Sequence, residues 1–313
     1  MNGDAKAMSL KARIRNRARE LSLPPHVVLQ NYVFERFLAR LAASEWRSRL
    51  VLKGGLLIAH LHGLAARSTM DMDATVRGVA LDENLAMRAV SEICAIDGDD
   101  GLLLRAVSCE PIRGKDRYGG CRVHFDAAFG IILVHLSVDL STGDAMTPAP
   151  VEYELPGLFE PSRPIRLLGY NLETILAEKL ESILTLGGLG TRPRDYYDVW
   201  LLSRDGPDTG RLQAAFRETC RHRGTEARLV DGADRIRAIA VDEALQGHWA
   251  RYARQFPYAA KLSFPEVVEA VDNLFRLAIA PACGIIMGGH GACGAFQIKG
   301  NGIAYARLGI SIS

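Results

Sequence analysis

The sequence predicts an α+β fold with two lobes: a mixed sheet with helices in the N-terminal half, and a helical C-terminal lobe. Residues 69–76 and 132–140 alternate polar and apolar side chains, which is typical of strands because side chains alternate faces along a strand. Residues 166–281 carry apolar residues at helical spacing instead. We therefore expect a first domain over residues 1–165, a helical lobe over residues 166–281 and a separate tail over residues 282–313.

Two helices are expected at the start of the chain, over residues 9–44, with a break at Pro24 and Pro25. In the second helix, apolar residues recur every four positions from Val33 to Leu41 and form one stripe. Such a stripe predicts that this helix packs against a core.

The following region mixes short strands and helices. Residues 49–53 predict a strand that ends at two glycines, and residues 56–63 predict a helix directly after them. Residues 121–135 suggest a hairpin. Together these segments predict the sheet of the first domain.

After Pro161 and Pro164 the pattern turns helical as far as about Ala280. The last helix opens with a capping box of Ser263 and Glu266. The tail that follows is glycine-rich and contains no Asp or Glu, so we expect a disordered or non-native extension there.

Composition and charge narrow the setting. The net charge is +2, but residues 1–53 hold eleven Lys and Arg against four acids, which favours a phosphate-rich partner or else a solvated helix face. The six cysteines include no CxxC pair, and no apolar run resembles a signal peptide or the ~20 residues of a membrane span. We expect a cytoplasmic protein with no membrane contact.

Three aspartates carry the chemistry that the sequence predicts. Asp71, Asp73 and Asp139 each lie on the polar face of an expected strand. If those strands are neighbours, ~4.8 Å apart, the carboxylates converge and repel one another unless a cation lies among them. Mg²⁺ prefers oxygen ligands of this kind together with substrate phosphates. The alternative for an Asp-x-Asp pair is a solvent-facing edge strand.

The two glycines before the expected helix predict an anion site. Gly54 and Gly55 leave backbone N–H groups free at a helix N-terminus and let a phosphate approach closely. An ordinary turn is the alternative. Ser68 and Thr69 adjoin the Asp-x-Asp pair, so a hydroxyl there could contact phosphate, be a site of covalent modification, or only lie at the edge of the strand.

Lys179 lies in the apolar stripe of its helix, in the row that Ile175 and Ile183 form. Either its amine reaches solvent at the edge of the stripe or it points inward toward a triphosphate. A cluster of charged residues follows closely: Arg192, Arg194, Asp195 and Asp198. Asp195 could orient Lys179 or another basic residue, and the role of Asp198 could be no more than capping or pairing.

These motifs, as an ordered set, resemble the AbiEii/AbiGii-type nucleotidyltransferase toxins, which include the MenT-type toxins and belong to the DNA polymerase β-like superfamily. The matching stretches are VLKGGLLI, RSTMDMD, LSVDLSTGDAMTP, ETILAEKLESIL and TRPRDYYDVWLL, and the resemblance runs from about Ser9 to Pro281. It implies a polymerase β-like nucleotidyltransferase core with a helical C-terminal lobe. It also implies a toxin of a bacterial toxin–antitoxin or abortive-infection phage-defence pair, with a cognate antitoxin.

The resemblance assigns roles to particular residues. It places the glycine motif on Gly54 and Gly55 and the family's conserved lysine on Lys179. It implies that Asp71 and Asp73 are metal ligands and that Asp139 is the family's frequent third carboxylate. Asp195 matches a further conserved aspartate of the family. Two departures are Arg194, where relatives commonly carry lysine, and the adjacent Pro193.

Together with this resemblance, the carboxylates predict a nucleotidyltransferase that depends on Mg²⁺ or Mn²⁺ and transfers NMP from an NTP. The resemblance further implies an RNA acceptor, chiefly the 3′ end of tRNA, and a block of translation. In this prediction Asp71 and Asp73 hold the metals, and Asp139 shares one or acts as base. The glycines and Lys179 hold the triphosphate with help from further residues: Lys53, Ser68, Thr69 and Arg192. The rivals are NMP transfer to a protein hydroxyl, a catalytically silent nucleotide- or RNA-binding module, and a structural antitoxin-binding protein.

Overall fold

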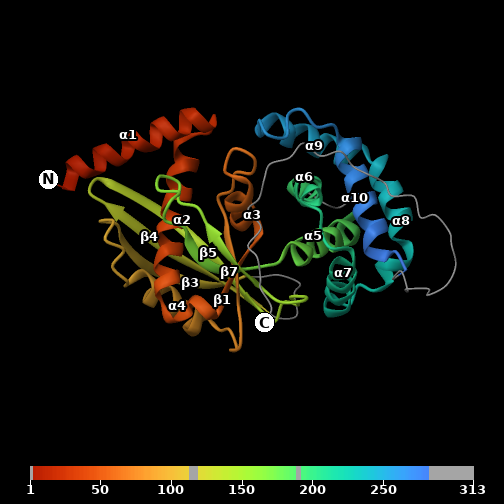
Figure 1. The fold of residues 1–313 in the computed structure, drawn as a ribbon, viewed down its shortest axis with the longest axis horizontal. Helices are drawn as coiled ribbons and strands as arrows, with labels where there is room; N and C mark the ends of the chain where they lie inside the picture. Colours follow the sequence, from red (N-terminus) through yellow and green to blue (C-terminus); the bar gives the residue numbers. More distant parts are fainter. Residues whose placement is uncertain (1–2, 113–118, 188–191, 282–313) are drawn as a thin grey trace, which may run out of the picture. The chain divides into compact units, whose positions relative to one another are not determined.

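A computed structural model of the chain describes residues 3–112, 119–187 and 192–281. Within these ranges seven strands form one mixed sheet in the order β3–β4–β5–β2–β1–β7–β6 (Figure 1). The strands are β1 (Leu50–Lys53), β2 (Met72–Val76), β3 (Leu103–Ile112), β4 (Gly120–Phe129), β5 (Ile132–Thr142), β6 (Val151–Leu155) and β7 (Ile165–Gly169). The mixed sheet with its helices confirms the predicted α+β class.

The two aspartate-bearing strands are neighbours, as predicted. β2 and β5 run parallel, and Asp73 lies directly opposite Asp139. On the opposite face of these strands Met72, Val138 and Leu140 are buried in the core. The period of two in the sequence therefore sorted polar from apolar faces correctly.

Ten α-helices accompany the sheet in the described ranges. They are α1 (Gly3–Leu21), α2 (Pro25–Ala43), α3 (Gly54–His62), α4 (Glu83–Cys94), α5 (Leu172–Leu186), α6 (Pro193–Leu202), α7 (Thr209–Arg223), α8 (Ala227–Ala240), α9 (Glu243–Gln255) and α10 (Phe264–Ile279). Within the described residues, short 3₁₀ helices cover Glu45–Ser48 and Ser203–Asp205. None of the described helices is both long and apolar enough to cross a bilayer.

The N-terminal helices form as predicted, with the break at Pro24 and Pro25 between α1 and α2. The apolar stripe of α2 is buried, and Phe37 stacks on Phe125 of β4 with ring centroids 5.0 Å apart. The hairpin of β4 and β5 also forms, with Phe129 opposite Ile132. One hydrophobic core continues from α2 and the sheet into α5, α6 and α10.

The expected helical pattern after Pro164 is wrong for Ile165–Gly169, which forms β7. This strand pairs in parallel with β1 and antiparallel with β6. Ile165 and Leu167 are buried on one face, so the alternation was present in the sequence, but five residues give a weak local signal. Pairing with β1, more than 100 residues earlier, decides that this segment is a strand.

The later helices match the predictions more closely. Ser263 Oγ accepts from the backbone N–H of Glu266, whose side chain accepts in return from the N–H of Ser263, so the capping box is present. The described residues up to Ala280 form one compact unit, within which β7 spans the boundary placed at residue 165. The division into two lobes stays a prediction, and the tail over residues 282–313 lies outside the described residues.

Candidate active site

Four charged side chains form a row across four neighbouring strands. Lys53 on β1 lies opposite Asp73 on β2. Asp73 in turn lies opposite Asp139 on β5, and Asp139 lies opposite Arg122 on β4. Since residues in direct register share a face of the sheet, two carboxylates stand side by side with a cation at each end of the row.

Asp73 is half-buried, as are Lys53 and Asp139 beside it in the row. Burial raises the pKa of Asp73 above its ordinary value, and the charge of Lys53 opposes that rise. The carboxylates of Asp139 and Asp71 raise the pKa further. Negative charge is therefore concentrated here beyond what the neighbouring lysine neutralises, which is the electrostatic setting that a bound cation relieves.

The glycines at the start of α3 allow the backbone to reach this carboxylate. Gly54 has φ +66°, and a Cβ on it would lie 2.3 Å from Asp73 Oδ2. A Cβ on Gly55 would lie 2.8 Å from Thr69 Oγ1. Any larger residue would thus displace the Asp73 carboxylate or the Thr69 hydroxyl. No side chain caps the N-terminus of α3.

Asp71 lies just before β2 and is exposed. Its Oδ2 accepts from Arg194 Nη1 of α6 at 3.1 Å, with both side chains more than half exposed. A hydrated pair of this kind is weak, so Asp71 exchanges this partner readily.

Asp139 has a firmer partner. Its two carboxylate oxygens accept from Nε and Nη2 of Arg122, each at 2.7 Å. This two-point contact satisfies the carboxylate from one side. Among the described residues, no group of three or more His, Cys, Asp and Glu side chains is arranged to hold a metal ion. A metal site of all three aspartates therefore stays a prediction.

A site made of Asp71 and Asp73 alone fits a hard divalent ion better than a site that also includes Asp139, because Arg122 already holds Asp139. Mg²⁺ is commonly held by one or two carboxylates, with the remaining positions filled by water and substrate phosphates. The carboxylates follow one another on the same strand face, next to a helix N-terminus that favours anions. These residues fit a metal that arrives together with a triphosphate.

Lys179 points inward, toward carboxylates of α6. Its Nζ lies 2.6 Å from Asp195 Oδ1 and 3.0 Å from Asp198 Oδ2. Burial lowers the pKa of Lys179, but the two carboxylates outweigh burial and hold the pKa above its ordinary value. Lys179 is thus a fixed cation whose charge also reaches Asp73.

Asp198 does more than cap the helix. It is fully buried and accepts from Nε of Arg67 at 2.6 Å and from Nη2 at 3.3 Å. Arg67 also donates to the carbonyl of Ser68. Sequence reasoning missed Arg67. This residue ties the segment before Asp71 to α6, the helix whose carboxylates contact Lys179.

A second buried cluster lies behind the row and was also missed. The carboxylate of Asp144 accepts from Lys53 Nζ at 2.5 Å and from Tyr170 OH at 2.8 Å, and Thr75 and Ser141 donate to it as well. Burial raises the pKa of Asp144, but Lys53 and these donors hold it well below its usual range. The cluster fixes the position of the Lys53 amine beside Asp73.

The remaining predicted residues differ in their surroundings. Ser68 and Thr69 are buried, and Thr69 Oγ1 accepts from the backbone N–H of Asp71 at 3.3 Å. The carbonyl of Thr69 accepts from Asn31 of α2. Arg192 is exposed at the start of α6. The two hydroxyl residues therefore shape the segment that carries Asp71, and Arg192 stays accessible at the rim.

Comparison with known proteins gives a family match. The model of the family described as "Nucleotidyl transferase AbiEii toxin, Type IV TA system" matches residues 36–275. Among solved structures, JHP933 from Helicobacter pylori is 16% identical, with a TM-score of 0.48, and the match covers 82% of this chain and 93% of that one. A candidate nucleotidyltransferase from Helicobacter pylori is also 16% identical, with a TM-score of 0.45 and coverage of 82% and 97%. No curated protein matches the sequence.

Proposed function

The chain belongs to the AbiEii nucleotidyl transferase toxin family of type IV toxin–antitoxin systems, and from this premise we propose that it transfers NMP from an NTP to RNA. The acceptor we propose is the 3′ end of tRNA, whose modification blocks translation. A cognate antitoxin would counter this activity, as the family implies.

One observation carries the proposal: the carboxylate of Asp73 lies against the N-terminus of α3 at Gly54, in register with Lys53. The free N–H groups of a helix start and a buried amine attract a triphosphate. The paired carboxylates attract the divalent ion that accompanies it. Lys179, held by Asp195, adds a second cation on the side of α5.

The proposed reaction moves one NMP. The 3′-hydroxyl oxygen of the acceptor forms a bond to the α-phosphorus of the NTP, and the bond from that phosphorus to the bridging oxygen breaks, so that pyrophosphate leaves. Asp71 and Asp73 would hold a divalent ion, which when bound would neutralise negative charge on the phosphates. Lys53 and Lys179 orient the triphosphate and stabilise its charge. The hydroxyl proton passes to a carboxylate, for which Asp139 is available once it leaves Arg122.

The N-terminal helix supports an RNA acceptor. α1 carries six Lys and Arg against two acids, and several of its arginines are exposed: Arg13, Arg15 and Arg19. Contacts of this kind bind phosphates without regard to sequence and weaken with salt. They would hold the acceptor strand while its 3′ end reaches the carboxylates.

The test is incorporation of label from each of four α-labelled NTPs, with Mg²⁺ or Mn²⁺, into purified tRNA and into total lysate. We expect label in RNA with the wild-type protein and none with Asp71→Ala, which removes one carboxylate from an exposed position. Asp234→Ala, an exposed aspartate on α8, is the matched control and should retain full transfer. Circular dichroism checks that both variants are folded.

Digestion separates the rival acceptors. Label that nuclease releases supports transfer to RNA, whereas label that only protease releases would show modification of a protein hydroxyl. NTP binding without pyrophosphate release would show a silent binding module. Transfer by Asp71→Ala at the wild-type rate would overturn the assignment of the aspartates.

A further inference from the structure

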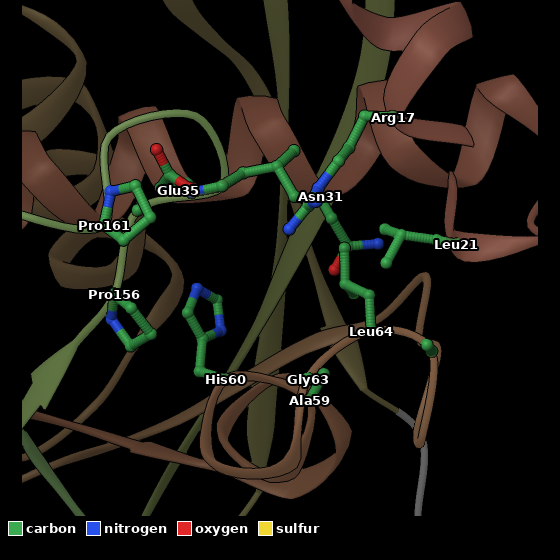
Figure 2. A pocket seen from close by; sticks show the side chains of 13 residues that line it. Arg17, Leu21, Asn31, Glu35, Ala59, His60, Gly63, Leu64, Pro156 and Pro161 are labelled. Atoms are coloured by element: carbon green, nitrogen blue, oxygen red, sulfur yellow. The ribbon is translucent and has the colours of Figure 1, made fainter. Parts of the chain in front are cut away.

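A cavity of about 220 Å³ lies apart from the row of charged residues, between α1, α2, α3 and the segment after β6. Figure 2 shows Arg17, Asn31, Glu35 and His60 around it. None of its lining residues is one of the predicted site residues. The proposed reaction therefore leaves this cavity without a role.

Asn31 supplies a buried acceptor with no partner. Its side chain is 3% exposed, and its Nδ2 donates to the carbonyls of Val27 at 2.9 Å and Thr69 at 2.8 Å. Since a carbonyl oxygen only accepts, these contacts fix the orientation of the amide and use both of its hydrogens. The Oδ1 atom is buried without a partner in the described part of the chain, which a ligand with an N–H donor would satisfy.

His60 adds a second acceptor. Its Nδ1 contacts the carbonyl of Leu56 at 2.9 Å, so this nitrogen carries the proton and Nε2 is left to accept. Burial lowers the pKa of His60, which keeps the ring neutral. The carboxylate of Glu35 accepts from the backbone N–H of Leu158 and from Arg36, so each of its oxygens already has a donor.

Arg17 offers the complementary donor. Its Nη1 is paired with Glu20 at 2.9 Å, while its Nε is buried and has no partner among the described residues. The other walls are apolar: Leu21, Leu64, Pro156, Leu158 and Pro161. Cavities for drug-sized ligands measure about 300–1,000 Å³, so this smaller one suits a single heterocyclic ring system.

We propose that this cavity binds one unpaired nucleobase with an exocyclic amine, such as adenine or cytosine, from the acceptor strand. The amine hydrogens match Asn31 Oδ1 and His60 Nε2, and the adjacent ring nitrogen matches Arg17 Nε. The acceptor assignment rests on the proposed function. Arg17 lies on the basic helix α1, whose other cations are placed to contact the phosphates beside such a base.

The cavity also connects to the carboxylates. Asn31 holds the carbonyl of Thr69, and Gln30 holds the carbonyl of Met70 at 2.7 Å. Thr69 and Met70 directly precede Asp71 in the chain. A base held by Asn31 would therefore lie one hydrogen bond away from the segment that positions the metal-binding pair.

Calorimetric titration of the full-length protein with nucleosides tests the binding. Adenosine should bind at least about fivefold more tightly than purine riboside, which lacks the amine, and cytidine more tightly than uridine. Ala65→Trp, at an exposed position on the rim, should abolish adenosine binding by filling the cavity. Its matched control is Ala214→Trp, at an exposed position on α7, which should bind as the wild type does.

Two further variants make the result decisive. His60→Leu should reduce the preference for adenosine over purine riboside toward one, because one acceptor is lost. Asp71→Ala should leave adenosine binding unchanged, because it removes an exposed carboxylate that does not line the cavity. Equal binding of adenosine and purine riboside, loss of adenosine binding in Asp71→Ala, or retention of adenosine binding in Ala65→Trp would each overturn the proposal.

Kinetics then test the acceptor role separately from the proposed function. In NMP transfer, Ala65→Trp should raise KM for RNA about tenfold and leave KM for the NTP unchanged. An unchanged KM for RNA overturns the assignment to the acceptor strand. Absence of transfer by the wild-type protein overturns the proposed function instead, and the nucleoside titration still decides what the cavity binds.

Discussion

Replacement of Asp198 by asparagine should destabilise the protein strongly, because this carboxylate is buried and neutralises cations. Asp198 is fully buried and pairs with two cations, the buried Arg67 at 2.6 Å and the half-buried Lys179 at 3.0 Å. Asp198→Asn leaves Lys179 with the carboxylate of Asp195 and removes the carboxylate that Arg67 contacts. Removal of one partner from a buried ion pair costs about 3–5 kcal/mol, and at about 2–4 °C per kcal/mol the Tm should fall by roughly 6–20 °C.

Thermal unfolding followed by circular dichroism measures this loss, with Glu20→Gln as control. Glu20 is paired with Arg17 on the exposed face of α1, so its neutralisation should leave Tm unchanged. Burial raises the pKa of Asp198, but Lys179 and Arg67 outweigh it and hold the pKa below its ordinary value of 3.8.

The sign of the pH dependence follows from that lowered pKa. The stability that Asp198 contributes is fully present above the ordinary pKa of an aspartate and is lost as pH falls through the lower folded-state value. The Tm difference between wild type and Asp198→Asn should therefore be full at pH 7 and shrink only in strong acid. If Asp198→Asn unfolds at the wild-type temperature at pH 7, the buried ion cluster does not stabilise the fold as argued.

Three other predictions concern the row of carboxylates. In the presence of a chelator, Asp73→Asn should have a higher Tm than the wild type, because the substitution removes a partly buried charge with a raised pKa. Added Mg²⁺ should raise the Tm of the wild type but not that of the variant, and differential scanning calorimetry measures both. Gly54→Ala should reduce NMP transfer by about 100-fold in the labelled-NTP assay, since the new Cβ would displace the carboxylate of Asp73; transfer at the wild-type rate would contradict this. Arg194→Lys should leave Tm unchanged and retain transfer within a few-fold, because its pair with Asp71 is exposed; a large drop in kcat would instead assign Arg194 a role with substrate.

Much of the candidate site was predictable because it depends on short-range periodicity. The alternation around Asp73 and Asp139 placed both on polar strand faces, and the glycine pair marked the turn from β1 into α3. The helical spacing around Lys179 placed its side chain among buried isoleucines. Each of these inferences needs only the geometry of one strand or one helix.

Partner choice was not predictable in the same way. Arg67 pairs with Asp198 across 131 residues, and Asp139 takes Arg122 as its partner on the next strand. Lys53, expected to assist at the triphosphate, is bound by Asp144. In the sequence these are ordinary charged residues, since neither local spacing nor composition marks which opposite charges will meet.

The sequence by itself therefore determined the fold class, the strand faces and the kinds of charged group on the site strands. Those properties follow from hydrophobic periodicity and glycine conformation, which act within a few residues. The tertiary structure decided which carboxylates are neutralised by arginine, which lysine is held beside Asp73, and that Asn31 presents an unpaired oxygen to a cavity. These depend on strand order and helix packing, which bring together residues far apart in the chain, and burial then makes each such contact energetically significant.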